Sequence, residues 1–371
     1  MKIATVAGTR PEWIRLSKLI PLLDSLLGNG HRLVHTGQNF SPELDANLFA
    51  ELDLRRPDLR IESGGESFAN QFAVLMPALE DFLARERPDR MVILGDTNSS
   101  LGAAIVAARL GIAIYHVESG NRCHGHQSPE EVNRRVIDHT STVHLCYSER
   151  ARMNLVAEGL PLARTFVVGN PLAEVLASEF SIEGEPTPWQ SKTWDMVGLS
   201  GPGMRFLSTM HRAENVDDQA RLWAFLNALQ AACEGENAMC LMSTHPRMRA
   251  RLNGTEAAWN RIVFSRPLPF RQFVAMEATA DLVLSDSGTA PEECAILARP
   301  LVILRDYMER QEVLERGGAV LWAPGYPVSL WMAVRSVMDR SGLPAPIPPE
   351  YSVRPVAATV ARLLLSPVPP C

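Results

Sequence analysis

Residues 2–16 read KIATVAGTRPEWIRL: an apolar run leads into a polar turn, and apolar residues with helical spacing follow. Residues 204–215 read MRFLSTMHRAEN and repeat this order, again with an arginine and a glutamate in the turn. A strand, a turn and a helix in succession form the repeating unit of a parallel α/β sheet. The restart in the middle of the chain therefore predicts two similar Rossmann-like α/β domains.

The alternation of strand and helix patterns also sets the expected domain boundaries. It runs through residues 1–180, with helices predicted over 11–27 and 41–52 among others. Residues 181–203 have the Gly- and Pro-rich composition of a linker. The alternation resumes over 204–350. Residues 351–371 carry a last helical pattern, which we expect to return to the N-terminal domain.

Composition narrows the classes of protein that this chain can represent. Of its 371 residues, 46% are hydrophobic and 21% are charged, which is typical of a globular fold. A net charge of −6 argues against a general nucleic-acid binder, which normally carries a basic surface. The sequence contains no Gly-Lys-Ser/Thr, Gly-x-Gly-x-x-Gly or Gly-x-Ser-x-Gly. A P-loop is therefore excluded, and neither a dinucleotide oxidoreductase nor a hydrolase elbow has support.

Several features predict a cytoplasmic location. The first residues begin a strand pattern and not a signal peptide, and the longest apolar runs have the length of strands, so no membrane segment is expected. The six cysteines are scattered without a Cys-x-x-Cys pair, as in a reduced cytosolic protein. Residues 123–126 read CHGH but lack a second ligand group at suitable spacing, so we expect no metal site.

Five polar clusters directly follow strand-like runs, at residues 8–12, 95–97, 116–120, 211–214 and 285–288. In an open parallel sheet, ligands bind at the carboxyl ends of the strands. Three clusters belong to the first half of the chain and two to the second. We therefore expect a cleft between two sheets, with acidic groups on one wall and anion-binding groups on the other.

Three carboxylates form the predicted catalytic set. Asp96 and Glu118 end strands that are expected to be neighbours, and Glu130 starts a helix after a polar loop. Carboxylates that share one site favour general acid/base chemistry. Glu131 is expected to point elsewhere, since it lies one helical step round. His211 ends a strand of the second domain and fits a general acid, a phosphate partner or a structural imidazole.

A second group of residues fits a phosphate-containing ligand. Residues 285–293 read SDSGTAPEE, a strand end, a tight turn at Ser287 and Gly288, and a helix start that would bind a diphosphate, although an ordinary helix cap has the same pattern. Glu293 lies within reach of a ribose diol. Arg10 and Arg15 are candidate phosphate or sugar contacts. Arg305 and Arg310 follow another strand-like run and could also face the cleft. The alternative is that Arg305 and Asp306 form an ion pair on the surface.

Taken in order, these clusters closely resemble the non-hydrolysing UDP-N-acetylglucosamine 2-epimerase family. The motifs are GTRPE at 8–12, GDT at 95–97, HVESG at 116–120, PEEVNR at 129–134, HRAE at 211–214, SDSG with EE at 285–293, and RD with ER at 305–310. The resemblance implies the glycosyltransferase-B arrangement, a homodimer, a UDP-sugar substrate bound by domain 204–350, and neither a metal nor a nicotinamide cofactor.

The resemblance also implies a mechanism. A base removes the C2 proton while UDP leaves C1, and UDP adds back after protonation of the opposite face of C2. By position, Asp96, Glu118 and Glu130 resemble the proton-transfer set, with His211 near the diphosphate. Arg10, Ser287, Gly288, Glu293 and Arg310 resemble the nucleotide contacts.

Some motifs depart from the family pattern and leave the substrate open. HTGQNF at 35–40, LGDTNS at 94–99 and ESGNRC at 118–123 are more similar to a capsule and O-antigen branch that acts on UDP-2-acetamido-2,6-dideoxy-hexoses, giving UDP-N-acetyl-L-fucosamine. The family's Gln-His-Arg, tied to allosteric activation by UDP-N-acetylglucosamine, is QNF at 38–40. UDP-N-acetylglucosamine 2-epimerase is the main hypothesis. The alternatives are the dideoxy-hexose epimerase, a hydrolysing 2-epimerase, a glycosyltransferase of the same fold and a non-catalytic binder.

Overall fold

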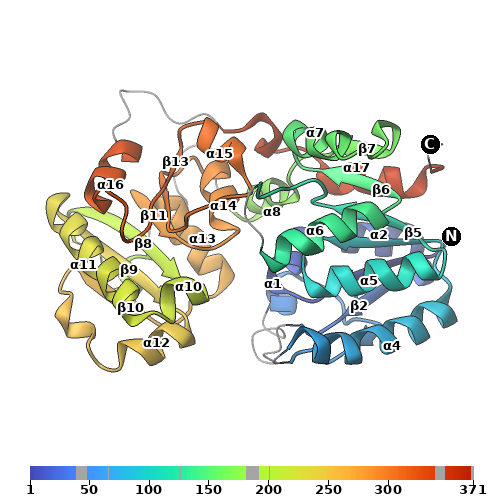
Figure 1. Ribbon diagram of the computed structural model, residues 1–371, viewed down its shortest axis with the longest axis horizontal. Helices are drawn as coiled ribbons and strands as arrows, with labels where there is room; N and C mark the ends of the chain where they lie inside the picture. The colour runs from blue at the N-terminus through green and yellow to red at the C-terminus, as the bar shows by residue number, and fades with distance from the viewer. Residues whose placement is uncertain are drawn as a thin grey trace. The chain divides into compact units, whose positions relative to one another are not determined.

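The computed structural model describes residues 1–38, 48–65, 67–124, 128–180, 192–199, 201–338 and 347–368. The chain divides into two compact units (Figure 1). Unit 1 comprises Met1–Val175 and Ser352–Cys371, and unit 2 comprises Leu176–Tyr351. Each unit is therefore described separately.

Unit 1 is built on a seven-stranded parallel sheet with the order β3-β2-β1-β4-β5-β6-β7. Every residue of β1 is buried, as expected where helices cover both faces of a parallel sheet. The strands are β1 (Ile3–Ala7), β2 (His31–His35), β3 (Leu59–Arg60), β4 (Arg90–Leu94), β5 (Ala113–Val117), β6 (Val143–Cys146) and β7 (Thr165–Val167).

Serine and threonine caps start several helices of unit 1. The hydroxyls of Ser67, Thr97, Ser128 and Ser148 each accept a hydrogen bond from a backbone N–H of the first turn that would otherwise lack a partner. The helices are α1 (Arg10–Leu16), α2 (Leu19–Leu27), α4 (Phe68–Glu86), α5 (Asn98–Arg109), α6 (Pro129–Thr140), α7 (Glu149–Ala157), α8 (Pro171–Glu179), which crosses into unit 2, and α17 (Val356–Leu365).

Helices α4 and α5 pack their apolar residues against one face of the sheet, as in the buried cluster that includes Leu79, Leu101 and Ile93. The last helix, α17, packs against α2, and the Arg90 side chain of β4 donates to the carbonyl oxygen of Leu364 (Figure 1). The C-terminal segment thus completes the covering of the sheet that begins at the N-terminus.

Unit 2 repeats the architecture with six parallel strands in the order β10-β9-β8-β11-β12-β13. The strands are β8 (Met204–Met210), β9 (Ala238–Thr244), β10 (Ile262–Ser265), β11 (Leu282–Ser285), β12 (Leu301–Ile303) and β13 (Ala319–Leu321). Its helices are α10 (Ala213–Val216), α11 (Gln219–Gly235), α12 (Pro246–Leu252), α13 (Phe270–Thr279), α14 (Ala290–Ile296), α15 (Gln311–Glu315) and α16 (Leu330–Met338). Its core includes Phe206, Phe225 and Trp322.

The prediction of two α/β units with parallel sheets is confirmed, but some elements differ. The sequence predicts one helix over residues 11–27, whereas α1 ends at Leu16 and α2 begins at Leu19. The Ser17 hydroxyl donates to the carbonyl oxygen of Ile14 at 2.8 Å, where it competes with helical hydrogen bonding. Residues 41–47 of the helix predicted over 41–52 lie outside the described residues.

Each sheet has one point where the strand order reverses. In unit 1 the chain leaves β1 toward β2 and β3 and then returns to β4 on the other side. In unit 2 the same reversal occurs between β8 and β11. Ligands of open α/β sheets bind beyond the strand ends at such points. Four of the five polar clusters of the sequence lie at these two places, and the fifth, at 116–120, follows β5 beside β4.

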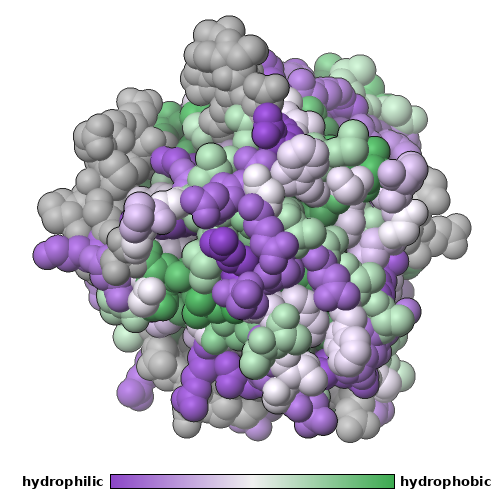
Figure 2. Space-filling model, turned by 90° about the vertical axis from the view of Figure 1, so that its left-hand side faces the viewer, coloured by the Kyte–Doolittle hydropathy of each residue, from purple (hydrophilic) through white to green (hydrophobic). Residues whose placement is uncertain are grey.

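The surface of unit 2 drawn in Figure 2 mixes hydrophilic residues with smaller hydrophobic areas. Single exposed apolar side chains, such as those of Trp223 and Met332, are ordinary on protein surfaces. Within the described part of the chain, no helix has the length and apolar character needed to cross a membrane.

Candidate functional site

Glu12 ties together the ends of β1 and β4 in unit 1. Its Oε2 accepts from the backbone N–H of Gly8 and Thr9 at 2.9 and 2.7 Å, and from the Thr9 hydroxyl at 2.8 Å. Its Oε1 accepts from the hydroxyls of Thr97 and Ser100 at 2.9 and 3.1 Å. Burial raises the pKa of Glu12, and these hydrogen bonds partly oppose the increase. The carboxyl group therefore fixes two loops that carry predicted site residues.

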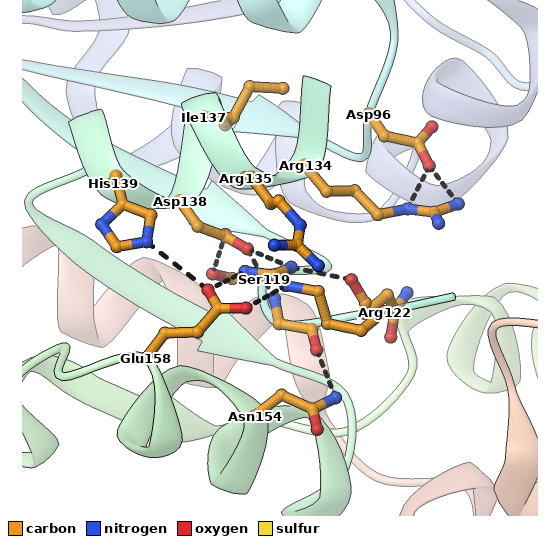
Figure 3. Close-up of polar contacts among 12 residues, drawn as sticks. Asp96, Ser119, Arg122, Arg134, Arg135, Ile137, Asp138, His139, Asn154 and Glu158 are labelled. Atoms are coloured by element: carbon orange, nitrogen blue, oxygen red, sulfur yellow. Dashed lines mark hydrogen bonds and ion pairs between the residues drawn. The ribbon is translucent and has the colours of Figure 1, made fainter. Parts of the chain in front are cut away.

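Asp96 follows β4 and is held by helix α6. Its Oδ2 accepts from Nε and Nη2 of Arg134, both at 2.7 Å (Figure 3). Its backbone oxygen accepts from Nδ2 of Asn133 at 2.8 Å. Asn133 and Arg134 are consecutive residues of α6, so side chain and backbone of Asp96 are both fixed by one rigid element.

Glu118 follows β5, the strand beside β4, where Val117 pairs with Leu94. Its backbone has a φ of 72°, a left-handed conformation that is uncommon for a residue other than glycine. The side chain is only 9% exposed, and Oε2 accepts from the Tyr147 hydroxyl at 3.2 Å. A Cβ added to Gly95 would lie 3.9 Å from the same oxygen, so the carboxylate lies against the turn that carries Asp96.

Arg15 lies beside Glu118 in unit 1. It is 5% exposed, and its Nε is 3.8 Å from Oε2 of Glu118. Arg10 is the first residue of α1 and is partly buried. The structure thus places Arg15 against Glu118, and Arg10 at the start of the helix that follows β1.

Glu130 and Glu131 differ in their surroundings. Glu130 is exposed in the first turn of α6, four residues before Arg134 and therefore on the same helix face. Glu131 is buried, and its Oε2 accepts from the backbone N–H of Cys123 at 2.9 Å and from Arg134 at 3.2 Å. Arg134 therefore links Asp96 to α6, which also carries Glu130.

In unit 2, Asp286 joins the ends of β8 and β11. It is fully buried, and it accepts from the backbone N–H groups of His211 and Arg212 and from the Asn215 side chain at 2.9–3.1 Å. The His211 ring is 42% exposed, with its Nδ1 3.1 Å from Oδ1 of Asp286. Burial alone would raise the pKa of Asp286, but the hydrogen bonds from His211 and Asn215 lower it overall.

The turn after β11 is ordered by its own hydroxyl groups. The Ser287 hydroxyl accepts from the backbone N–H of Thr289 at 3.2 Å, and Ser287 and Gly288 are both partly exposed. Glu293 is 7% exposed, and its Oε2 accepts from the Thr289 hydroxyl at 3.3 Å. The predicted loop and Glu293 thus form one connected group at the start of α14.

The arginines after β12 are buried in ion pairs. Arg310 pairs with Glu292 of α14, which is fully buried, and its Nη1 is 3.9 Å from Oε1 of Glu309. Arg305 pairs with Glu309 at 3.0 Å. Arg305 is therefore paired with Glu309 in the interior and not with Asp306 on the surface, which was the alternative. Arg310 lies beside the helix that carries Glu293.

Several residues of the site were missed at the sequence level. Arg134 had a signal, because it lies four residues after Glu130 on one helix face. Glu12 had a partial signal, because Thr9 and Glu12 have the spacing of a capping box, but its contacts to Thr97 and Ser100 join distant segments. Tyr147 had no signal beyond its place after a strand. Among the described residues, no group of three or more His, Cys, Asp or Glu side chains is arranged to hold a metal ion.

Comparisons with known proteins agree on one family. The family model described as UDP-N-acetylglucosamine 2-epimerase matches residues 28–356. The UDP-N-acetylglucosamine 2-epimerase of Methanocaldococcus jannaschii is 34% identical over 326 residues, 86% of this chain and 88% of the relative. The UDP-2,3-diacetamido-2,3-dideoxy-D-glucuronate 2-epimerase of Pseudomonas aeruginosa is 29% identical over 323 residues, 86% of this chain and 88% of the relative.

A solved structure extends the match to nearly the whole chain. The crystal structure of Methanocaldococcus jannaschii UDP-GlcNAc 2-epimerase in complex with UDP-GlcNAc and UDP has a TM-score of 0.86 and 31% sequence identity. The match covers 98% of this chain and 99% of that one.

Proposed function

This chain belongs to the UDP-N-acetylglucosamine 2-epimerase family, and we propose that it interconverts UDP-N-acetylglucosamine and UDP-N-acetylmannosamine without releasing free sugar. The observation that carries the proposal is the pair of carboxylates, Asp96 and Glu118, at the ends of adjacent parallel strands. Glu130 starts the helix that holds Asp96 through Arg134. Carboxylates grouped in this way suit the transfer of a proton to and from carbon.

The proposed reaction proceeds by elimination and re-addition. A base takes the C2 proton, the electrons of the C2–H bond form a C1–C2 double bond, and UDP leaves with the electrons of the C1–O bond. A proton then adds to the opposite face of C2, and UDP re-forms the bond to C1. Because the C2 proton is barely acidic, its removal depends on departure of the diphosphate, so the two events need one site.

In unit 1, Asp96, Glu118 and Glu130 are the proposed proton-transfer groups. Arg10 and Arg15 are the proposed contacts to phosphate or sugar. The 3.8 Å approach of Arg15 to Glu118 supports a place for Arg15 at the reacting end of the ligand.

In unit 2, Ser287, Gly288, Glu293 and Arg310 are the proposed contacts to UDP. His211 is proposed to assist near the diphosphate, because its ring is partly exposed while Asp286 holds its Nδ1 side. The proposal requires that UDP bound by unit 2 presents its sugar to the carboxylates of unit 1. It also includes the cleft, homodimer and cytoplasmic location expected from the sequence.

Deuterium exchange tests the proposed reaction directly. The protein is incubated with UDP-N-acetylglucosamine in deuterated water, and C2 is followed by NMR. Deuterium at C2 of UDP-linked products supports the proposal. Free N-acetylmannosamine and UDP would indicate a hydrolysing epimerase, and absence of exchange with every UDP-sugar would indicate a glycosyltransferase or a binder.

The same assay distinguishes between substrates. The Pseudomonas aeruginosa relative acts, by its name, on a diacetamido-dideoxy-glucuronate, and the sequence motifs also resemble those for dideoxy-hexoses. A panel of UDP-sugars with these groups, compared by kcat/KM, identifies the preferred one. Turnover at least tenfold faster with a dideoxy sugar would replace UDP-N-acetylglucosamine as the assigned substrate.

Glu118→Gln tests the proposed proton transfer. The variant keeps the size of the side chain but removes its ability to take up a proton, so C2 exchange should be lost. UDP binding, measured by calorimetry, should remain as in the wild type, because Glu118 is not among the proposed UDP contacts. Wild-type turnover of the variant would remove Glu118 from the mechanism.

A further inference from the structure

Helix α6 carries a further ionisable residue, Asp138, on the same face as Glu130 and Arg134. The three are spaced by four residues, so they lie in a row along the helix. Asp138 is fully buried, and Figure 3 shows it pointing into a group of polar side chains that includes Ser119 and Arg122. Asp138 therefore has no contact with solvent, and its neighbours belong to or adjoin the turns that carry Asp96 and Glu118.

One set of contacts connects Asp138 to the turn that carries Asp96. Oδ1 of Asp138 lies 2.7 Å from Nδ1 of His116, and Nε2 of the same ring lies 2.8 Å from the carbonyl oxygen of Gly95. A carbonyl oxygen only accepts, so Nε2 donates to it. Gly95 has a φ of 73° and directly precedes Asp96. The orientation of this peptide is thus set from Asp138 through one imidazole ring.

A second set of contacts connects Asp138 to the turn that carries Glu118. The Ser119 hydroxyl donates to Oδ1 of Asp138, and the backbone N–H of Gly120 donates to Oδ2 at 3.2 Å. These two residues directly follow Glu118, whose left-handed backbone needs support from its surroundings. A single carboxylate therefore connects to both turns, to the Ser119–Gly120 turn directly and to the Gly95–Asp96 turn through His116.

A buried arginine fixes the carboxylate from the other side. Nη1 of Arg122 donates to Oδ2 of Asp138 at 2.8 Å, and Nε and Nη2 donate to Glu158 at 2.7 and 2.6 Å (Figure 3). Burial alone would raise the pKa of Asp138, but the hydrogen bond from His116 and the charges of His116 and Arg122 lower it well below its usual range. An ionised carboxylate accepts from all four donors at once.

We propose that Asp138 is a positioning residue that sets the distance between the carboxylates of Asp96 and Glu118 by holding the turns that carry them. The inference rests on the proposed function, since it concerns the geometry of the same reaction. Asp138 also fixes α6, which carries Glu130, relative to both turns. Because a misplacement of about 1 Å reduces rates about 100-fold, loss of this anchor should act on the chemical step.

The test measures C2 exchange, kcat and KM for Asp138→Asn, and UDP affinity by calorimetry. The amide places an N–H donor where Oδ2 or Oδ1 now accepts, so at least one turn loses its acceptor. We expect kcat to fall about 100-fold, with KM and UDP affinity changed by less than about threefold. Reduced stability alone would lower the amount of folded enzyme but would not lower turnover per folded molecule at constant UDP affinity.

Glu158→Gln is the matched control. Within the described residues, the Glu158 side chain contacts Arg122 and His139 and neither turn. The control variant weakens the pair between Glu158 and the same buried arginine but leaves the contacts of Asp138 toward both turns in place. Its kcat should therefore stay within about threefold of the wild type. Equal losses of kcat in both variants would overturn the proposal, because the effect would then belong to Arg122 and not to the turns.

Ser119→Ala keeps the proposal falsifiable if Asp138→Asn does not fold. It removes the hydrogen bond from the Ser119 hydroxyl to Asp138, together with the 3.0 Å contact of that hydroxyl to Nδ1 of His144, and kcat should fall at least tenfold with unchanged UDP affinity; wild-type kcat would overturn the proposal. Absence of C2 exchange in the wild-type protein would instead refute the proposed function itself. Wild-type exchange together with fully active variants would refute only the positioning role.

Discussion

Replacement of Glu12 by alanine should destabilise unit 1 much more than replacement by glutamine. In the alanine variant, the buried backbone N–H groups of Gly8 and Thr9 lose the acceptor that now lies 2.9 and 2.7 Å away. An unsatisfied buried donor costs about 1–3 kcal/mol, so two cost about 2–6 kcal/mol. Glutamine keeps one acceptor oxygen for these donors. Its amide can donate to the hydroxyls of Thr97 and Ser100, and the expected cost is about 1 kcal/mol or less.

The difference in the free energy of unfolding between the wild type and the Glu12→Gln variant should depend on pH. Burial raises the pKa of Glu12 above its ordinary value of 4.5, so above pH 4.5 the folded state binds more protons at this group than the unfolded state. The wild-type free energy of unfolding, relative to that of the glutamine variant, should therefore decrease as pH rises from 4.5 through the folded pKa. If the ionised carboxylate of Glu12 stabilised the fold, the relative free energy of unfolding would instead increase with pH over this range.

Native-state hydrogen exchange in urea measures these free energies, with peptides that contain Ile3–Ala7 reporting on unit 1 alone. The matched control is Glu80→Gln, which changes an exposed side chain of α4 and should alter the free energy by less than about 0.5 kcal/mol. A glutamine variant as unstable as the alanine variant, or a relative stability that increases with pH, would refute the reasoning.

Three further predictions concern single contacts, each measured as a free energy of unfolding. Gly120→Ala should cost more than about 2 kcal/mol, because the new Cβ would lie 2.2 Å from the carbonyl oxygen of Ala151 at a φ of 90°; an unchanged value would contradict this. Burial lowers the pKa of His144 from 6.5 to about 4, so stability should be lost as pH falls through this range, and His144→Gln should abolish that loss; an equal acid dependence in the variant would count against it. Glu292→Gln should cost about 3–5 kcal/mol by removing the carboxylate that pairs with buried Arg310, whose contact to Glu309 is longer at 3.9 Å, and a loss below 1 kcal/mol would contradict the expectation.

The parallel α/β architecture was predictable because strands buried on both faces form continuous apolar runs between helices. The run at Ile3–Ala7 showed this clearly, and Met204–Met210 less so, because Arg205, Ser208 and Thr209 interrupt it. The edge strands β3 and β13 were not predicted. β3 has only two residues, Leu59 and Arg60, and no apolar run marks it, so pairing with β2 creates this strand. β13 has three partly buried residues and lies in the apolar run AVLWA at 319–323, so a local signal was present there.

The strand-end positions of the candidate site were predictable for a similar reason. Asp96, Glu118 and His211 each follow directly on an apolar run, and parallel topology brings such positions to one edge of a sheet. The supporting residues were not predictable. Asp138 lies in the third turn of a helix, and Asp286 resembled part of a phosphate loop, whereas its carboxylate caps the end of β8. Their roles arise from contacts between segments far apart in the sequence.

The return of α17 to α2 has a consequence for synthesis of the protein on the ribosome. Residues 1–175 emerge first, but α2 lacks its packing partner and Arg90 lacks its carbonyl acceptor until residue 364 has been translated. At about 5–20 residues per second, the intervening stretch takes roughly 10–40 s. During that interval the face of α2 that α17 covers stays exposed, so unit 1 completes its packing only after the C-terminal segment has been made.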